Sequence, residues 1–399
     1  MLTSKDYMDL EAKYGAKNYK PIPVVISKAK GVWVWDPEGK KYMDCLSAYS
    51  AVNQGHLHPR IIKAVENQIK TLTLTSRAFY NNRLGSFLKK LCEVSGMEVA
   101  LPMNTGAEAV ETGIKIARRW GYRIKKVPAN KAEIITCNEN FHGRTTTIIS
   151  FSTDEGCRED FGPFNQGFVN IPFNDVDALE KAIKPNTVAF LVEPIQGEAG
   201  VIIPDEGYLK KVRDVCTKHN ILLIADEIQT GFCRTGKMFC FMHDNIKPDI
   251  LLVGKALGGG VMPVSAAITR KEIMDVITPG SHGSTFGGNP LACAVGEAAI
   301  DVLVDEKLAQ RSEELGQYFL EQIQAIQSPL FHDVRGKGLF VAIQLKAEAG
   351  KARIYTEQLK NKGLLAKETH EHTIRLAPPL VITKEELNWA ISILRDVFL

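Results

Sequence analysis

Residues 249–260 read DILLVGKALGGG, an apolar run that stops at a glycine, presents one lysine and soon continues into three more glycines. The run predicts a short buried β-strand over 249–254. Lys255 therefore follows the end of a hydrophobic strand, at a point where glycines free the backbone to bend. Lysine side chains are rarely fully buried, so its placement there needs a chemical reason.

Other short segments share this character and predict the rest of a sheet. They are continuously apolar rather than alternating, as expected for strands that are covered on both faces: 98–103, 133–137, 188–194, 221–227 and 264–269. Segments with helical periodicity lie between several of them, with apolar stripes formed by Val110, Ile114 and Ala117 and by Leu209, Val212 and Cys216. Strands that alternate with helices predict an α/β fold with a mostly parallel central sheet flanked by helices.

The chain has 399 residues, too many for one hydrophobic core. Near residue 300 its pattern of apolar and charged residues changes. We expect a large domain over 49–300 and a smaller α+β domain over 301–399, which begins with an amphipathic helix near 304–326. Residues 1–48 contain a predicted hairpin around Pro37–Gly39 and should pack with the smaller domain.

Composition argues against several classes of partner and location. The net charge is +3, and no run of Lys and Arg is long enough to read as a nucleic-acid or membrane-surface patch. No apolar run approaches the roughly 20 residues needed to cross a bilayer. The eight cysteines are scattered without a CxxC pair, and the first residues resemble neither a signal nor a transit peptide. These features predict a cytoplasmic protein with reduced thiols.

Ionisable residues follow three of the predicted strands: Glu193, Asp226 and Lys255. A single strand-end charge is usually a surface loop charge, but ligands of open α/β sheets bind beyond the carboxyl ends of the strands. A desolvated lysine loses its proton more easily and becomes a nucleophile that can form a Schiff base with an aldehyde. The glycines after Lys255 would then let a bulky aldehyde cofactor approach the backbone.

The segment MNTGAEAV, residues 103–110, predicts a phosphate site. Asn104 or Thr105 can cap the helix that begins there, and the free N–H groups and the dipole of a helix start favour an anion. An ordinary N-cap explains this segment equally well. A second cluster of small polar residues, 280–290, offers the hydroxyls of Ser284 and Thr285, although a flexible lid loop has the same composition.

A nucleotide-binding alternative fails on its motif. The acidic strand end at Asp226 is similar to the magnesium-holding strand of P-loop ATPases, which also need GxxxxGK[ST]. Here Ala256 follows Lys255, and Asp249 occupies the place of the first glycine. A metal site is not indicated either, because His56 and His58 lack a third ligand nearby in the sequence.

A lysine anchor, a phosphate site and a carboxylate for a ring nitrogen together describe a site for pyridoxal 5′-phosphate (PLP). A carboxylate such as Asp226 would keep the pyridine nitrogen protonated, so that the ring can accept electrons. Either Phe141 or His142 could stack on that ring, although an isolated Phe is usually a core residue.

Six motifs in order and spacing resemble the class III, fold type I, PLP-dependent aminotransferases. They are NTGAEAVE (104–111), FHGRT (141–145), EPIQGEAG (193–200), LLIADEIQTGFCRTG (222–236), PDILLVGKALGGG (248–260) and GSTFGGNPLA (283–292). The resemblance covers nearly the whole chain. It implies that Lys255 carries the covalent link to PLP and moves a proton between the substrate carbon and the cofactor.

The same resemblance implies the other cofactor contacts. Asp226 would pair with the ring nitrogen, Gln229 with the ring hydroxyl, and the N–H groups of Gly106 and Ala107 with the phosphate. Phe141 would stack on the ring, and Glu193 would orient neighbouring groups. Thr285 would reach the phosphate of the other subunit in a homodimer with shared active sites.

The stretches SAYSAVNQGHLHPRI (47–61) and RLAPPLVI (375–382) resemble the members of this family that act on ornithine. The resemblance implies that ornithine donates its terminal amino group and 2-oxoglutarate accepts it. Arg144 would hold the α-carboxylate of ornithine, Tyr19 its α-amino group, and Tyr49 would favour ornithine over simpler ω-amino acids.

Arg375 would clamp 2-oxoglutarate, and Glu198 would pair with Arg375 while ornithine is bound and then swing away. Two alternatives remain at this point. One is another ω-aminotransferase, acting on acetylornithine or 4-aminobutyrate, and the other is a protein of this fold that binds a ligand without catalysis.

Overall fold

The structure is a computed structural model that describes residues 2–399. Its centre is a seven-stranded sheet in the order β4-β10-β9-β8-β7-β5-β6. The strands are β4 (Val99–Met103), β5 (Glu133–Cys137), β6 (Phe168–Ile171), β7 (Thr187–Val192), β8 (Leu222–Asp226), β9 (Ile250–Val253) and β10 (Ser265–Thr269). Only β10 runs antiparallel to its neighbours, which confirms the mostly parallel sheet; β6 was not predicted.

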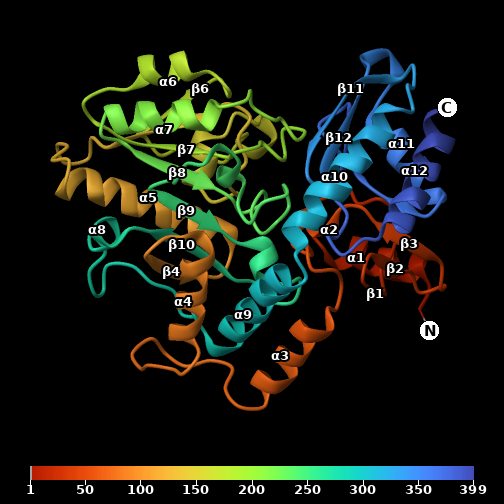
Figure 1. The fold of residues 1–399 in the computed structure, drawn as a ribbon, viewed down its shortest axis with the longest axis horizontal. Helices are drawn as coiled ribbons and strands as arrows, with labels where there is room; N and C mark the ends of the chain where they lie inside the picture. Colours follow the sequence, from red (N-terminus) through yellow and green to blue (C-terminus); the bar gives the residue numbers. More distant parts are fainter. Residues whose placement is uncertain (1) are drawn as a thin grey trace.

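Helices cover both faces of this sheet, which explains why its strands are apolar without alternation (Figure 1). On β8, Leu222 and Ile224 face the core around α5 (Gly106–Arg123), while Leu223 packs with α7 (Tyr208–Lys218) on the other face. Helix α5 lies so close to the sheet that a Cβ on Gly121 would come within 2.2 Å of Val188.

Five other helices surround these layers. Helix α6 (Val176–Ala182) packs beside α7, and α4 (Leu84–Ser95) lies against α9 (Pro290–Asp305), as does α3 (Pro59–Ile69). The short helix α8 (Lys271–Met274) follows β10. Among residues 2–399, no helix is both long and apolar enough to cross a membrane.

The C-terminal part forms a second, smaller layered unit, drawn in blue in Figure 1. Its sheet has the order β11-β12-β15-β14; two helices, α10 and α11, pack on it, and α12 lies against both. The predicted helix near 304–326 is shorter, because the chain turns at Lys307, whose φ is 52°. The elements are α10 (Leu308–Gln324), β11 (Phe331–Lys337), β12 (Phe340–Leu345), α11 (Ala352–Asn361), β14 (Lys367–Thr369), β15 (Thr373–Leu376) and α12 (Lys384–Phe398).

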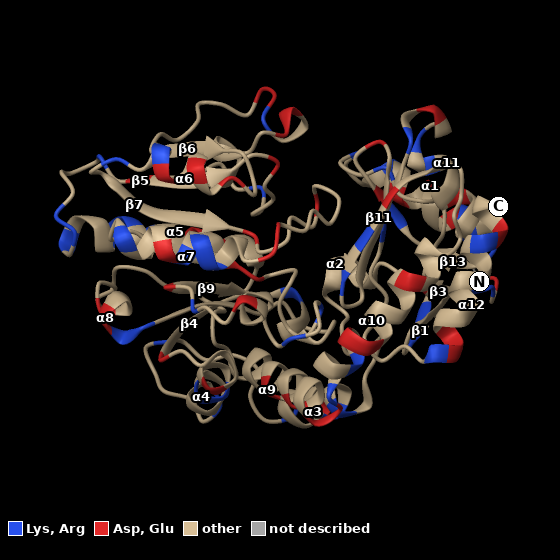
Figure 2. Ribbon diagram, turned by 45° about the horizontal axis from the view of Figure 1, so that its top comes forward, with Lys and Arg blue, Asp and Glu red and all other residues tan. Residues whose placement is uncertain are grey.

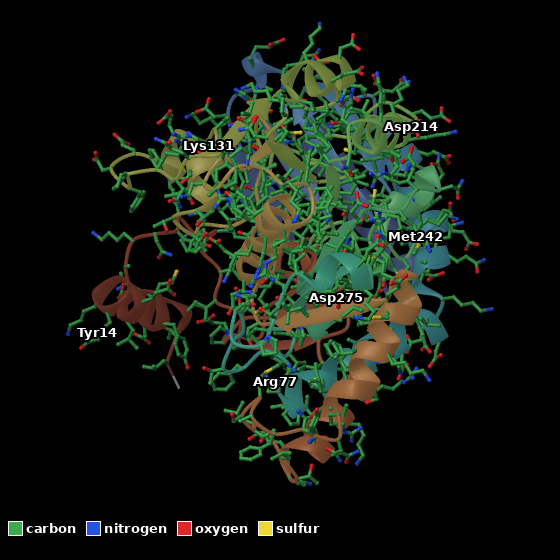
Figure 3. The ribbon with its side chains drawn as sticks, turned by 90° about the vertical axis from the view of Figure 1, so that its left-hand side faces the viewer. Tyr14, Arg77, Lys131, Asp214, Met242 and Asp275 are labelled. Carbon is green, nitrogen blue, oxygen red and sulfur yellow. The ribbon has the colours of Figure 1, made fainter. Side chains whose placement is uncertain are left out.

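The N-terminal segment joins this C-terminal unit. Strands β1 (Lys28–Lys30), β2 (Trp33–Trp35) and β3 (Lys41–Asp44) form an antiparallel ribbon, and β13 (Leu364–Leu365) pairs in parallel with β3. The turn between β2 and β3 closes with a hydrogen bond from the Gly39 N–H to the Asp36 carbonyl. Helix α1 (Ser4–Tyr14) has no buried residue, and Figure 3 shows Tyr14 at its far end, away from the body of the molecule.

Both histidines of the GHLHP loop have ordinary structural partners. His56 Nε2 lies 2.8 Å from Asp44 Oδ2, and the His58 side chain caps the start of α3. Within residues 2–399, no group of three or more His, Cys, Asp or Glu side chains is arranged to hold a metal ion. Acidic and basic residues are mixed over the helices, as Figure 2 shows.

Candidate active site

The three ionisable strand ends meet at one edge of the large sheet. Because β7, β8 and β9 are parallel neighbours, the residues at or just beyond their carboxyl ends come together: Glu193, Asp226 and Lys255. All three line a cavity of about 210 Å³. The cavity is also lined by Gly106, Ala107, Phe141, His142, Gly143 and Gln229.

Lys255 begins a single 3₁₀ turn, η4 (Lys255–Gly258), directly after β9. Its φ of 44° lies in the left-handed region, a strained conformation for a lysine and one that clusters at functional sites. Burial lowers the pKa of the Lys255 amine, while the nearby Glu198 and Asp226 carboxylates act in the opposite direction. Among the described residues, none forms a hydrogen bond or ion pair with Lys255 Nζ, so the amine is available to react.

The glycines after Lys255 are not among the residues that line the 210 Å³ cavity, although Gly260 lines a cavity of about 370 Å³ together with Lys255. Two of them also let the chain turn against neighbouring elements. Gly259 has a φ of 56°, and a Cβ there would come within 2.7 Å of Ile61 on α3. Gly260 has a φ of 72°, and its Cβ would approach Val52 within 3.2 Å. These glycines therefore serve packing behind the lysine.

Asp226 is buried and has a partner that was not predicted. His142 Nδ1 lies 2.6 Å from Asp226 Oδ2, and the Ile228 N–H donates to Oδ1 at 3.1 Å. Burial works against protonation of His142, but its hydrogen bond to Asp226 and the charge of that carboxylate outweigh burial and raise the pKa of His142. The other ring nitrogen, Nε2, is buried without a partner among residues 2–399. The position of His142 beside Phe141 gave no signal for this pairing.

Glu193 organises the loop that carries Phe141. Its Oε2 accepts the Phe141 N–H at 2.9 Å, and its Oε1 accepts the Gly197 N–H at 3.4 Å. Burial raises the pKa of Glu193 to about 7. The carboxyl group thus fixes the backbone of the aromatic residue that lines the cavity.

The start of α5 offers N–H groups to the same cavity. Thr105 caps the helix in a capping box with Glu108, and Gly106 and Ala107 follow as its first residues. In the part of the chain that the structure describes, the N–H groups of Gly106 and Ala107 have no acceptor, as expected for the first turn of a helix. Such a helix start binds phosphate well. The exposed Thr285 lies outside this cavity, although its neighbour Ser284 accepts a hydrogen bond from Asn104 Nδ2 at 2.8 Å.

A second cavity of about 490 Å³ adjoins the first and shares Phe141, His142 and Gly143 with it. It contains all the residues expected to bind the substrate: Tyr19, Tyr49, Arg144, Glu198 and Arg375. Tyr19 is 64% exposed, and the segment behind it is held by Arg353, which donates to the Pro21 carbonyl at 2.6 Å.

Arg375 and Glu198 form an ion pair inside this cavity. Arg375 is 1% exposed, and its Nη1 lies 2.6 Å from Glu198 Oε1. Burial would raise the pKa of Glu198, but the positive charges of Arg375 and Lys255 outweigh it and hold that pKa below its usual value. Gln229 Nε2 donates to Glu198 Oε1 and to the Tyr49 carbonyl, both at 3.3 Å, and so joins the two cavities.

Arg144 is in the opposite state. It is exposed, and no ion pair to it exists among the described residues; its guanidinium carbon lies 6.0 Å from the centre of the Phe141 ring. One cavity therefore holds a free arginine at its open side and a neutralised arginine in its interior.

Comparisons with known proteins agree with this geometry. The family model described as aminotransferase class-III matches residues 14–398. The chain is 61% identical to an ornithine aminotransferase of Brevibacillus brevis, over 96% of each chain. It is 47% identical to the solved ornithine aminotransferase of Toxoplasma gondii, covering 100% of this chain and 95% of that one, with a TM-score of 0.98. It is also 49% identical to an acetylornithine aminotransferase of Elizabethkingia anophelis, covering 100% and 99%, with a TM-score of 0.91. A family match over almost the entire length, joined to this arrangement of lysine, carboxylates and helix start, shows that the chain belongs to the class-III aminotransferases.

Proposed function

We propose that this protein transfers the terminal amino group of ornithine to 2-oxoglutarate, giving glutamate 5-semialdehyde and glutamate. The observation that carries this proposal is the pair of arginines in one cavity: Arg144 is free, whereas Arg375 is neutralised by Glu198. Such an arrangement suits two substrates that carry their carboxylates at different distances from the reacting group.

The residues present fit PLP, the cofactor of this family. The unpartnered N–H groups of Gly106 and Ala107 match a phosphate, Asp226 matches a ring nitrogen, and the cavity wall offers Phe141 to the ring. When bound, PLP supplies an aldehyde for the amine and a ring that accepts electrons from the substrate carbon. His142 holds Asp226 in place at 2.6 Å, so the carboxylate cannot turn away from the cavity.

Geometry must select the terminal amine of ornithine, because its two amines have similar chemistry. Arg144 at the open side of the cavity would bind the α-carboxylate and keep it far from Lys255. Tyr19 and Tyr49 would contact the neighbouring α-amino group of ornithine. Lys255 would then move a proton at the terminal carbon, helped by the lowered pKa of its amine.

The second substrate needs its carboxylate close to the reacting carbon. Arg375 offers a planar fork suited to bidentate binding of a carboxylate, provided that Glu198 leaves it. During the ornithine step, Glu198 neutralises Arg375 and prevents it from seizing the α-carboxylate. The ion pair thus decides which end of an amino acid reaches Lys255.

Acetylornithine is the second candidate substrate, favoured by the similarity to the Elizabethkingia anophelis enzyme. Acetylation removes the positive charge of the α-amino group. The exposed Tyr19 and the half-buried Tyr49, which line the same cavity, support a free α-amino group instead. Single-turnover rates with ornithine and with acetylornithine would separate the two, and a faster reaction of acetylornithine would replace the proposal.

The proposal is tested by Glu198→Ala, which leaves Arg375 permanently free. We expect a slower single-turnover reaction with ornithine and a faster one with glutamate, because the exposed clamp draws any α-carboxylate toward Lys255. An unpaired buried charge costs several kcal/mol, so the change in the ratio of the two rates should exceed about tenfold. Glu155→Ala, which alters an exposed glutamate of the same cavity without an ion pair among the described residues, is the control. If both rates fall together, Glu198 is a structural residue and the switch must be abandoned.

We further propose that the protein acts as a homodimer with shared sites. Exposed aromatic residues lie on two loops whose flanking residues are in contact, since the Leu291 N–H at the start of α9 donates to the Thr73 carbonyl at 3.4 Å. Phe79 and Tyr80 lie on one loop, and Phe286 follows Thr285 on the other. Sedimentation should detect a species of twice the 44.1 kDa chain mass. Thr285→Ala should weaken PLP binding without dissociating the dimer. A monomer that binds PLP normally would refute this proposal.

A further inference from the structure

Residues Ser47–Ser50 form one turn of left-handed helix, α2, in which none of the residues is glycine, asparagine or aspartate. Their φ angles are 51°, 47°, 60° and 69°. For L-residues this conformation brings Cβ too close to the following carbonyl oxygen, so consecutive residues rarely adopt it. Strain of this kind persists only where surrounding contacts over-determine the backbone, and it clusters at functional sites.

Two groups hold the turn. Asp44 Oδ1 accepts the N–H groups of Leu46 and Ser47, both at 2.9 Å, which fixes the entry into the turn. The hydroxyl of Ser47 donates to the Ala377 carbonyl at 2.6 Å. Ala377 lies two residues beyond Arg375, and its own N–H donates to the Cys45 carbonyl at 2.7 Å. The turn is therefore tied to the segment that carries the buried arginine.

The turn separates two cavities and presents a different face to each. On one face, Tyr49 lines the substrate cavity, with its ring centre 5.1 Å from the guanidinium carbon of Arg375. On the other face, Ala48 and Ala51 line a cavity of about 370 Å³ that also contains Lys255. A return of this segment to ordinary right-handed angles would rotate Tyr49 away from Arg375.

We propose that Ser47 is a positioning residue for substrate selection: its hydroxyl locks the left-handed turn to the Arg375 segment and so holds the Tyr49 ring over the guanidinium. This inference rests on the proposed function. The Tyr49 hydroxyl has no partner within residues 2–399, so the locked tyrosine would be free to bind the α-amino group of the substrate. A released turn keeps Lys255 intact but loses discrimination between amino acids with and without an α-amino group.

The test compares ornithine with 5-aminopentanoate, which is ornithine without its α-amino group. Ser47→Ala should lower the ratio of the two kcat/KM values by about fivefold to tenfold, the order of one lost hydrogen bond. Most of the change should lie in the KM for ornithine, with kcat for 5-aminopentanoate unchanged. Ser50→Ala is the matched control, because the buried Ser50 hydroxyl on the same turn has no partner among the described residues. A ratio that stays at the wild-type value in Ser47→Ala overturns the inference.

Two more variants keep the test decisive if Ser47→Ala folds poorly. Ser47→Gly removes the hydroxyl but adopts positive φ freely, so it should fold and should still lower the ratio. Ala48→Gly relieves the left-handed strain, since glycine adopts positive φ freely, so it should keep the wild-type ratio and should not lower the thermal midpoint. A merely structural turn would lose stability and activity on both substrates together, which would refute a role in selection. A wild-type enzyme with no preference for ornithine would instead refute the proposed function itself.

Discussion

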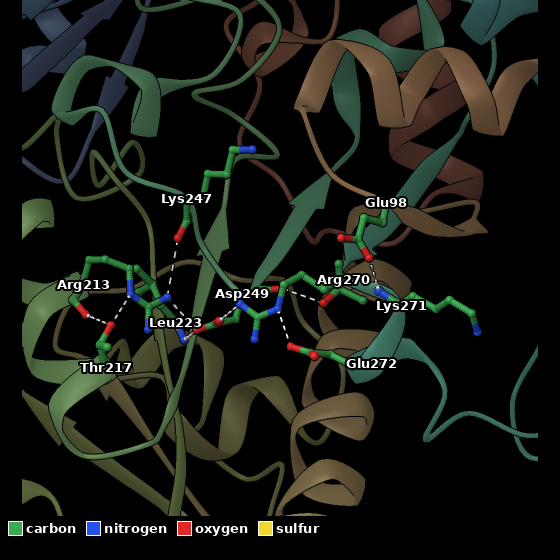
Figure 4. Close-up of polar contacts among 10 residues, drawn as sticks. Glu98, Arg213, Thr217, Leu223, Lys247, Asp249, Arg270, Lys271 and Glu272 are labelled. Atoms are coloured by element: carbon green, nitrogen blue, oxygen red, sulfur yellow. Dashed lines mark hydrogen bonds and ion pairs between the residues drawn. The ribbon is translucent and has the colours of Figure 1, made fainter.

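The two ends of the neighbouring strands β8 and β9 carry buried aspartates in opposite situations. At one end, Asp249 precedes β9 and is enclosed by cations: Arg213 lies at 2.6 Å and Arg270 at 2.8 Å (Figure 4). It also accepts the Leu223 N–H at 2.7 Å, which ties the starts of both strands together. At the other end, Asp226 has only His142 as a charged or ionisable partner, and Lys255 beside it has none in residues 2–399.

This difference separates a structural cluster from a site. Both aspartates are 4% exposed, so burial does not distinguish them. At the Asp249 end, the charged groups are paired with one another within the protein: two arginines contact one carboxylate. The Asp226 end keeps a lysine, a buried ring nitrogen of His142 and two N–H groups of α5 without protein partners. Groups left free at the carboxyl edge of a parallel sheet are the ones that bind a ligand.

The largest effect should follow removal of the free amine. Lys255→Ala should lower turnover by about 10⁴-fold or more, because both nucleophile and proton shuttle are lost. The thermal midpoint of unfolding should not fall, because burial of the Lys255 amine is unfavourable and the substitution removes that amine. Steady-state kinetics and thermal unfolding measure the two, with Lys247→Ala near the Asp249 end as the control. Turnover within tenfold of wild type would show that the free end is not the active site.

The reverse pattern is expected for Asp249→Ala. It leaves Arg213 and Arg270 without their shared partner and the Leu223 N–H unsatisfied, so the free energy of unfolding should fall by about 3 kcal/mol or more. The protein that remains folded should turn over at the wild-type rate. Urea unfolding and active-site titration measure these quantities. Equal loss of rate and stability would contradict the division between the two ends.

Much of this contrast could be predicted from the sequence. The strand ends that converge at Lys255 follow from apolar runs of the right length, and parallel neighbours must bring their carboxyl ends together. The pairing of His142 with Asp226 could not be predicted, because it depends on how the loop after β5 folds back over the sheet. The left-handed turn at Tyr49 also had no signal, since SAYS carries none of the residues that favour positive φ. The close packing of Gly259 against Ile61 could not be predicted either, because packing and cofactor access both favour glycine.

Asp226→Asn should have a smaller effect than loss of the lysine. The amide keeps the shape of the side chain but loses the charge that would hold a ring nitrogen protonated. We expect turnover to fall by about 100-fold, the scale of one lost electrostatic contribution, together with weaker PLP binding. Stopped-flow rates and equilibrium dialysis against PLP measure this. Wild-type values for both would mean that another residue of the cavity tunes the cofactor.

The smallest effect concerns pH and Glu193, which lies at the end of β7 beside Asp226. Burial raises the pKa of Glu193 to about 7 in the folded chain. Above the ordinary value near 4.5, the unfolded chain has lost this proton while the folded chain still holds it, so Glu193 makes stability fall as the pH rises toward 7. Its contribution to the slope is at most about 1.4 kcal/mol per pH unit.

Glu193→Gln should remove the contribution of Glu193 to the pH dependence of stability, measured by urea unfolding from pH 5 to 7. It should also shift the pH profile of turnover. Burial also raises the pKa of Glu227 to about 7, but Glu227 itself does not line the cavity, and its carboxylate accepts hydrogen bonds from the Thr230 hydroxyl and from the N–H groups of Cys240 and Phe241. Glu227→Gln should therefore change the slope of stability while leaving the pH profile of turnover in place. If both variants shift that profile equally, the free end of the sheet extends to Glu227, and the boundary of the site must be redrawn.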